Sequence, residues 1–499
     1  MLLTWTIWIS LIGAAATTVL GRGRPGLARG LALGVSLAGL LLAGWGALSM
    51  GVPDGAVTLA RVPWIPALGI EFHLAADGVS LALLLLTGVA AVAGVLFSWN
   101  VERGANAFFG LYLLLIGGVY GVFLSQDLFL FFAFYELAIV PKYFLIAIWG
   151  STRREYGAMK LALYSFVGSA MVLVGILAIY VAAGQQTFDL VRLSEAGLTA
   201  AFQGWAFPLV FVGFAILAGL WPFHTWAPTG HVAAPTAASM LLAGVVMKLG
   251  AYGALRVAMA LMPEGARLWG PAVATLAVVG IVYAALVALV ERDFKFVIGY
   301  SSVSHMGFVL LGLAAATPRG MSGAVLQMVS HGVIAGLLFG VVGRMVYDRT
   351  HTRELSVLEG LRLARALPFA AVTFTLASVA SMGLPGFSGF VAELQVLMGT
   401  WQAYPWAAMA AGLGVVLSVA FTLRVLQRAF FGELGAAGDV GGGGMEPMPP
   451  ITWAEGVGAV LLLGTSLAIG LFPQGWIARI DAGLASPVFG ALRTTMGWP

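Results

Sequence analysis

Long apolar stretches, separated by short polar segments, are the main pattern of this chain. Measured against the ~20 residues that a helix needs to cross a bilayer, the pattern predicts about fourteen membrane-spanning helices. We therefore expect an all-α integral membrane protein. The approximate spans are 2–21, 28–50, 75–98, 107–125, 128–149, 158–182, 204–226, 233–261, 271–290, 294–315, 321–346, 366–398, 404–431 and 451–472.

Composition supports the membrane assignment and excludes several classes of protein. The chain is 60% hydrophobic and 9% charged, whereas soluble domains are roughly 25% charged. No basic block suited to nucleic acid and no glycine-rich phosphate loop occurs. Because the chain has no cysteine, it cannot ligate an iron–sulfur cluster through thiolates. Redox chemistry would belong to a partner, or to a haem held by histidine.

The distribution of loop charge predicts how the helices are oriented. If the N-terminus faces outside, most of the 25 lysine and arginine residues fall on the cytoplasmic side, as the positive-inside rule requires. This arrangement places both termini outside. No positive residue precedes the first apolar run, "MLLTWTIWISLIGAAATTVLG", so we interpret that run as a first helix and not as a cleaved signal.

Two of the predicted spans contain helix-breaking residues. Pro222 in "GLWPFHTWAPTGHVAAPT" removes the helical bond to Ala218, and Pro385 in "SMGLPGFSGFVAEL" removes the bond to Ser381. Paired breaks at matching positions of two halves are typical of transporters. The alternative is that proline and glycine are simply common in membrane helices. We favour breaks in helices 7 and 12 of two five-helix halves.

The remaining segments suggest five parts. Residues 1–74 hold the first two helices and an irregular outer loop over 51–74. The halves cover 75–265 and 266–431, a glycine-rich cytoplasmic loop covers 432–450, and the last helix with its tail covers 451–499. The tail after Phe472 is weakly amphipathic, and we expect it to lie on the membrane surface.

Ionisable residues within the spans are the candidate functional groups, because a charge at the bilayer centre costs ~2.5–3.5 kcal/mol on insertion scales. Glu136, in "YELAIVPKYF", lies well inside its span. It suits a proton relay, although a permanently protonated structural role is the alternative. Lys142 lies ~120° around the helix and ~9 Å along it, so it does not simply pair with Glu136. That Lys142 snorkels to the cytoplasmic surface is at least as strong an interpretation as a relay role.

Four further groups extend this set. Lys248, in "LLAGVVMKLGAYG", is too far from either surface to snorkel, and Glu393 follows the second break. His305 and His331 occupy neighbouring spans and can relay protons, although structural histidines bonded to carbonyls are the alternative. His224 and His231 lack carboxylate or thiolate neighbours in sequence, so we do not predict a metal site there. We predict that Glu136, Lys248, His305, His331 and Glu393 form a polar axis halfway across the membrane.

Four stretches carry a resemblance to a known family. "HTWAPTGHVAAPTAASMLLAGVVMKLGAYG", "DFKFVIGYSSVSHMGFVLLG", "QMVSHGVIAGLLFGVVGRMVYDRTHTREL" and "MGLPGFSGFVAEL" resemble the antiporter-like membrane subunits of respiratory complex I, over about residues 75–472. The resemblance implies fourteen helices with two inverted five-helix repeats, and proton translocation coupled to quinone reduction in another subunit. It assigns relay roles to Glu136, Lys248, His305, His331 and Glu393.

The same resemblance has implications for partners and location. NADH, flavin, iron–sulfur clusters and quinone are expected in partner subunits, with no cofactor in this chain. The partners are neighbouring membrane-arm subunits, in a bacterial cytoplasmic membrane.

The chain also departs from the family pattern. The family usually has a lysine on helix 7, where Leu217 stands here, and Thr229 and Ala233 replace its usual Asp and Glu. One hypothesis is that Lys142 supplies the missing cation. The alternatives left open are a sodium/proton antiporter or membrane-hydrogenase subunit, a scaffold that does not pump, and a freestanding transporter.

Overall fold

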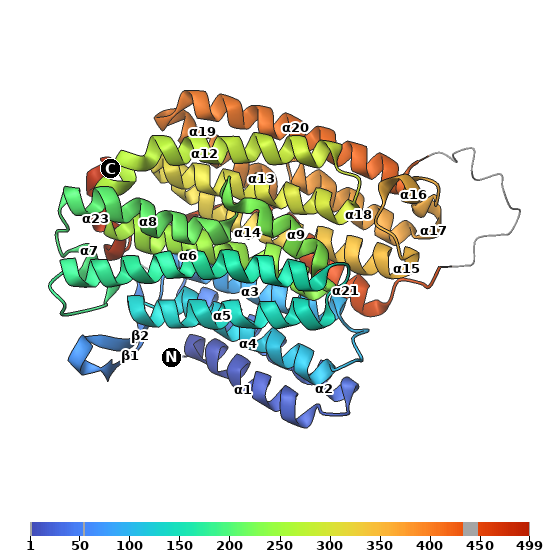
Figure 1. The fold of residues 1–499 in the computed structure, drawn as a ribbon, viewed down its shortest axis with the longest axis horizontal. Helices are drawn as coiled ribbons and strands as arrows, with labels where there is room; N and C mark the ends of the chain where they lie inside the picture. Colours follow the sequence, from blue (N-terminus) through green and yellow to red (C-terminus); the bar gives the residue numbers. More distant parts are fainter. Residues whose placement is uncertain (1, 53–54, 433–447, 499) are drawn as a thin grey trace, which may run out of the picture.

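The computed structural model, which describes residues 2–52, 55–432 and 448–498, is a bundle of long helices lying side by side (Figure 1). Among the described residues, 13 helical segments are long and apolar enough to cross a membrane. They contain α1 (Trp5–Leu20), α2 (Pro25–Ser49), α3 (Gly78–Phe97), α4 (Ala105–Leu124), α5 (Leu128–Trp149), α6 (Arg154–Ala182), α8 (Ala200–Ala218) with α9 (Trp226–Ala233), α10 (Thr236–Leu241) with α11 (Met247–Gly253), α12 (Pro263–Val290), α13 (Phe294–Ala315), α14 (Pro318–Gly340) with α15 (Asp348–Thr350), α20 (Pro405–Phe430) and α21 (Trp453–Leu471).

A further span is built from two half-helices, α18 (Pro368–Ser381) and α19 (Ser388–Ala403). Neither half alone has the length of a full span. With this broken helix included, the predicted all-α membrane fold of about fourteen spans is confirmed.

The two predicted breaks are present in the backbone. α8 ends at Ala218 and α18 ends at Ser381. These are the residues whose carbonyls Pro222 and Pro385 leave without a helical donor. Each break also contains a glycine in the left-handed region, Gly219 with φ 87° and Gly383 with φ 73°, where other residues are strained.

The eighth span contains two wide turns in place of regular α-helix. π-helical segments cover Leu242–Val246 and Ala254–Met259, on either side of α11. Such turns leave backbone carbonyls out of the regular ladder and often occur at functional sites. A third π-helical segment, Val341–Tyr347, follows α14.

Matching backbone bridges relate the two halves to one another. Asp127 caps α5 and pairs with Asp189, which caps the short helix α7 (Leu190–Ser194). Asp293 caps α13 and pairs with Glu354, which precedes α16 (Leu355–Glu359). In each half the bridge joins the start of the second helix to the segment before the broken helix. α7 and α16 lie at opposite ends of the bundle (Figure 1), as inverted repeats require.

The expectation of an irregular loop over 51–74 was wrong. β1 (Val57–Ile65) and β2 (Ile70–Ala76) form an antiparallel hairpin, with Val57 opposite Ala76 and Ile65 opposite Ile70. Glycine and proline within the first five positions, 51–55, suggested a loop over the whole segment. The strands begin after these positions, at Val57, and Pro63 lies within β1. In a two-stranded sheet both strands are edges, and there proline is tolerated.

The C-terminal tail packs onto the protein at the end that also holds the N-terminus. It forms α22 (Gln474–Leu484) and α23 (Gly490–Met496). The carbonyl of Arg479 occupies the space where a Cβ on Gly78 would lie, so the tail covers the start of α3. Both termini are at one end of the bundle, and α15, α16 and α17 (Leu363–Ala366) are at the other (Figure 1). Most of the predicted glycine-rich loop, 433–447, lies outside the described residues.

Candidate functional site

Lys248 and His331 form the centre of the site. The Lys248 side chain is fully buried, and its Nζ lies 2.7 Å from Nδ1 of His331. Nζ also donates to the carbonyl of Ala243, which belongs to the π-helical turn before α11. An ammonium donates to a neutral imidazole, whereas a neutral amine accepts from one. This contact can therefore pass a proton in either direction.

His305 continues the site toward the second break. Its ring lies nearly parallel to that of His331, with the ring centroids 5.7 Å apart. Nδ1 lies 2.8 Å from the carbonyl of Ser301, and Nε2 lies 3.0 Å from the carbonyl of Ser381. The Ser381 carbonyl is available because Pro385 has no N–H to donate. Since carbonyls only accept, a neutral ring donates to one of them, and a ring that carries two protons donates to both.

Glu393 completes the connected group. Its Oε1 is 3.5 Å from Nε2 of His305, and the Gln327 side chain hydrogen-bonds to the carboxyl group. A Cβ on Gly383 would lie 2.8 Å from Oε2 of Glu393. The glycine in the break therefore makes room for this carboxyl group.

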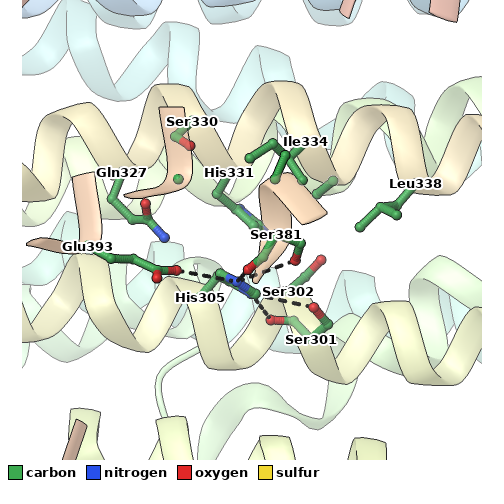
Figure 2. Close-up of a pocket in the computed structure, with 13 residues that line it drawn as sticks. Ser301, Ser302, His305, Gln327, Ser330, His331, Ile334, Leu338, Ser381 and Glu393 are labelled. Carbon is green, nitrogen blue, oxygen red and sulfur yellow. Dashed lines mark hydrogen bonds and ion pairs between the residues drawn. The ribbon is translucent and has the colours of Figure 1, made fainter. Parts of the chain in front are cut away.

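A small cavity joins these side chains. Its volume of ≈ 10 Å³ is about the space that one water molecule needs. Figure 2 shows His305, His331 and Glu393 converging on it from three helices, with serine hydroxyls around them. Polar lining also comes from Ser301, Ser302, Gln327, Ser330 and Ser381. A single ordered water is therefore enough to extend the proton path between the two histidines and Glu393.

Glu136 and Lys142 form a separate group on α5. Lys142 is 0% exposed, and its Nζ lies 3.1 Å from the Ser165 hydroxyl and 6.0 Å from the centre of the Trp226 ring. The snorkelling interpretation was therefore wrong. Glu136 is half-buried and interacts with the Ser169 hydroxyl and with the charge of Lys142. Ser165 and Ser169 are one turn apart on α6, so they connect the two ionisable groups.

The two groups are not in direct contact. Among the described residues, no hydrogen bond or ion pair joins Glu136 or Lys142 to Lys248. The half-helix α9 contributes to both groups, since Trp226 lies against Lys142 and His231 is within electrostatic range of Lys248. The structure thus brings together Lys248, His331, His305 and Glu393 and leaves Glu136 one helix away. Leu217 is buried and apolar.

Sequence analysis missed a polar connection at the end that carries α15–α17. Lys295 was counted among the cytoplasmic loop charges, but it is 3% exposed. Its Nζ donates to the Ala234 carbonyl at 2.8 Å and the Ser239 hydroxyl at 3.3 Å. His231 stacks on Phe339 and lies within electrostatic range of Lys295 and Lys248. A cavity of ≈ 440 Å³ reaches Lys295 from that end.

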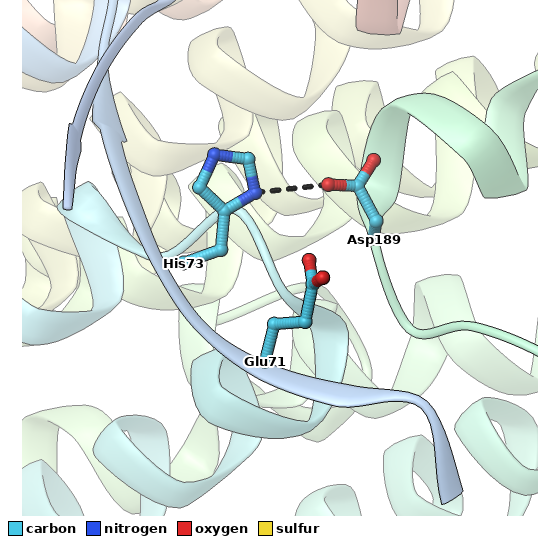
Figure 3. A group of neighbouring side chains, drawn as sticks. All are labelled: Glu71, His73 and Asp189. Carbon is cyan, nitrogen blue, oxygen red and sulfur yellow. Dashed lines mark hydrogen bonds and ion pairs between the residues drawn. The ribbon is translucent and has the colours of Figure 1, made fainter. Parts of the chain in front are cut away.

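A second ionisable cluster lies at the opposite end, beside the hairpin. Glu71, His73 and Asp189 face one another (Figure 3), with His73 Nδ1 2.9 Å from Asp189. These side chains have the spacing of metal ligands, but the Arg61 guanidinium supplies the cation at 2.6 Å from Glu71 and 3.6 Å from Asp189. We assign this cluster to anchoring of the hairpin.

The carboxyl groups of this outer cluster respond differently to burial. For Asp189, burial favours the neutral acid, but hydrogen bonds from His73 and the Arg192 amide outweigh it and lower the pKa. For Asp127, burial dominates over three backbone hydrogen bonds and raises the pKa to about 6. The ionised Asp189 therefore holds His73 and Arg61 against the bundle.

Comparison with known proteins identifies the family. The model of the NADH:quinone oxidoreductase/Mrp antiporter transmembrane family matches residues 125–419. NADH-quinone oxidoreductase subunit M of Rhodobacter capsulatus is 39% identical, over 87% of this chain and 87% of the relative. A chain of respiratory complex I from Thermus thermophilus superposes with a TM-score of 0.87 at 30% identity, covering 98% of this chain and 99% of that one.

A chain of the Mrp complex from a Dietzia species has the same fold, with a TM-score of 0.85 at 23% identity and coverage of 99% and 98%. Because the family model covers more than half of the chain and the Rhodobacter relative matches nearly its whole length, the protein belongs to the NADH:quinone oxidoreductase/Mrp antiporter family of membrane subunits, as the sequence motifs predicted.

Proposed function

We propose that this chain is a proton-translocating membrane-arm subunit of an NADH:quinone oxidoreductase. The single observation that carries the proposal is the buried row of Lys248, His331, His305 and Glu393. Nζ of Lys248 lies 2.7 Å from His331, the two histidine rings stack 5.7 Å apart, and His305 lies 3.5 Å from Glu393. These are groups that gain and lose protons, and they are buried where lipid and bulk water do not reach them. They are contributed by four different spans, three of which contain a break or a π-helical turn.

Protons reach Lys248 from the end that carries α15–α17. The cavity at Lys295 admits water, and Ser239 and His231 stand between Lys295 and Lys248. From Lys248 the proton passes to His331, His305 and Glu393. A charge change in a neighbouring subunit drives each transfer by altering the relative proton affinities of these groups.

Glu136 and Lys142 act as the charged pair of the first half. The Lys142 ammonium stabilises an ionised Glu136 across the hydroxyls of Ser165 and Ser169. In this role Lys142 supplies the cation that Leu217 does not. Movement of the pair changes the field at α9 and therefore at His231 and Lys248.

The assembly supplies everything else that the reaction needs. NADH, flavin, iron–sulfur clusters and quinone bind in partner subunits, and this chain holds no cofactor of its own.

Within this chain, the two antiporter-like halves cover residues 75–265 and 266–431. The remaining parts are the N-terminal segment 1–74, the glycine-rich loop 432–450 and the C-terminal segment 451–499. The membrane is the bacterial cytoplasmic membrane, with both termini on its outer side.

The test is replacement of Lys248 in the purified complex, reconstituted in liposomes. Lys248→Met removes the proton carrier, and Lys248→Arg keeps a charge that does not release its proton. Both variants should lower the number of protons pumped per NADH oxidised, whereas Arg365→Met, an exposed charge elsewhere, should not. An unchanged ratio in both Lys248 variants would overturn the proposal.

The shared fold supports a second candidate, an antiporter subunit of a different complex. Sodium-dependent proton movement without NADH oxidation would favour that function. A scaffold without transport is the third candidate, based on Leu217. It predicts that Lys248 and Glu393 variants pump normally.

A further inference from the structure

A buried arginine lies about two turns beyond Lys248 in the eighth span, toward the end that holds the termini. Lys248, Tyr252 and Arg256 follow at intervals of four residues, so Arg256 is about 12 Å from Lys248 along the helix axis. Nε of Arg256 donates to the Tyr252 hydroxyl at 3.0 Å, which confirms that the two side chains share one face of the span. Arg256 is only 2% exposed.

Arg256 is paired with the cap of α3. Its Nη2 lies 2.6 Å from Asp77 Oδ2 and 3.2 Å from the Ser80 hydroxyl. Asp77 also accepts from the Ser80 amide through its other oxygen. The Tyr252 hydroxyl is 3.3 Å from the Ser80 hydroxyl and 3.2 Å from the Phe123 carbonyl. A polar column therefore runs from Tyr252, one turn beyond Lys248, toward the end that holds the termini.

Without its guanidinium, this column would be a proton wire. Hydroxyl and carboxyl groups both accept and donate protons, so Tyr252, Ser80 and Asp77 could pass a proton outward in turn. A guanidinium has donors but no acceptor, and it does not deprotonate in proteins. Arg256 occupies the Tyr252 oxygen and one Asp77 oxygen with its own donors. A proton that left Lys248 in this direction would meet the fixed positive charge of the guanidinium, which repels it.

Two further observations fit a role of Arg256 in stopping proton movement along the column. Nη1 of Arg256 has no hydrogen-bond partner among the described residues, although buried donors in a purely structural pair are normally satisfied. The C-terminal tail covers the column, with the Phe489 ring 5.2 Å from the guanidinium carbon.

We propose that Arg256 is a proton block, which closes the direct outward route from Lys248 so that protons leave it only sideways through His331. The inference rests on the proposed function, because it assumes that Lys248 carries the transported proton. In this proposal Arg256 prevents proton leak and takes no part in proton transfer from Lys248 to His331.

The experiment measures leak in the absence of turnover. The whole complex is reconstituted in liposomes, a pH gradient is imposed without NADH, and its decay is followed with an entrapped dye. Arg256→Gln leaves a side chain that accepts hydrogen bonds, and the gradient should decay several-fold faster. Arg267→Gln, at an exposed arginine paired with Glu264 at the same end, is the matched control and should keep the wild-type rate.

Two further variants separate a block from a structural role. Arg256→Lys keeps the charge and the ion pair, so a structural role predicts rescue, whereas a block predicts leak because an ammonium can release its proton. Adding Tyr252→Phe to Arg256→Gln removes the hydroxyl of the residue one turn beyond Lys248 and should restore the slow decay.

The outcomes distinguish failure of this inference from failure of the proposed function. Wild-type decay in Arg256→Gln, rescue by Arg256→Lys, or leak that persists without the Tyr252 hydroxyl would each overturn the block. If Lys248→Met still lowers pumping in such a case, the proposed function stands. Unaltered pumping in both Lys248 variants would remove the basis of both proposals.

Discussion

At the scale of single residues, the burial of Lys142 supports the proposal that it supplies the cation missing at Leu217. Lys142 is wholly buried between Ser165 and Trp226, and a buried ammonium is costly unless it interacts with an opposite charge. Glu136 is the carboxyl group within electrostatic range. We therefore propose that Lys142 is a functional part of the first half.

This role predicts a reciprocal rescue. Lys142→Met should lower proton pumping as strongly as Glu136→Gln, because either change leaves one charge without its partner. Introducing Leu217→Lys into the Lys142→Met protein should restore pumping in part, by placing a cation at the alternative position. The measurement is protons per NADH in liposomes. Val140→Met, two residues before Lys142 and exposed on the surface of α5, is the control. Full pumping by Lys142→Met would exclude the role.

The sequence showed which residues are functional candidates more readily than it showed which way their side chains point. Glu136, Lys248, His305, His331 and Glu393 were identified because charge and histidine stand out within apolar spans, although their relay roles remain proposals. Lys295 and Arg256 were assigned to loops, because both are near the ends of spans where charges usually face water. The structure buries both side chains. The position of a residue near the end of a span does not determine whether its side chain faces water or protein. Its burial depends on neighbouring helices that are distant in sequence.

At the scale of elements, the broken helix and the site depend on one another. Pro385 frees the Ser381 carbonyl for His305, and Gly383 leaves space for Glu393. The proline and glycine pattern was sufficient to predict both breaks. It did not indicate which side chains would use them, since His305 is more than seventy residues away from Ser381.

A matched pair of glycine substitutions tests this coupling. Gly383→Ala should destabilise the protein by about 1–3 kcal/mol through its backbone conformation and should also displace the Glu393 carboxyl group, which lowers pumping. Gly386→Ala has a comparable backbone cost, with φ 103°, but a Cβ there meets nothing within 4 Å. It should reduce thermal stability and leave pumping per NADH intact. Equal pumping by the two variants would show that Glu393 does not need the space at Gly383.

At the scale of the whole molecule, the inverted halves place equivalent bridges at opposite ends. Asp127 with Asp189 closes one end, and Asp293 with Glu354 closes the other. Each bridge fixes the segment that leads into a broken helix, so the two breaks are held at similar depth from opposite sides. The positive-inside rule then predicts that the end carrying α15–α17 faces the cytoplasm, because most arginine and lysine residues fall on that side in the helix arrangement predicted from the sequence.

Orientation can be measured directly because the chain contains no cysteine. We expect Thr494→Cys, exposed on α23 at the end with both termini, to react with a membrane-impermeant maleimide in intact spheroplasts. Ser356→Cys, exposed on α16 at the other end, should react only in inverted vesicles. Detection by mass of this subunit avoids interference from cysteines in partners. Labelling of Ser356→Cys in intact spheroplasts would reverse the orientation, and would make the cavity at Lys295 an outlet for protons and not an inlet.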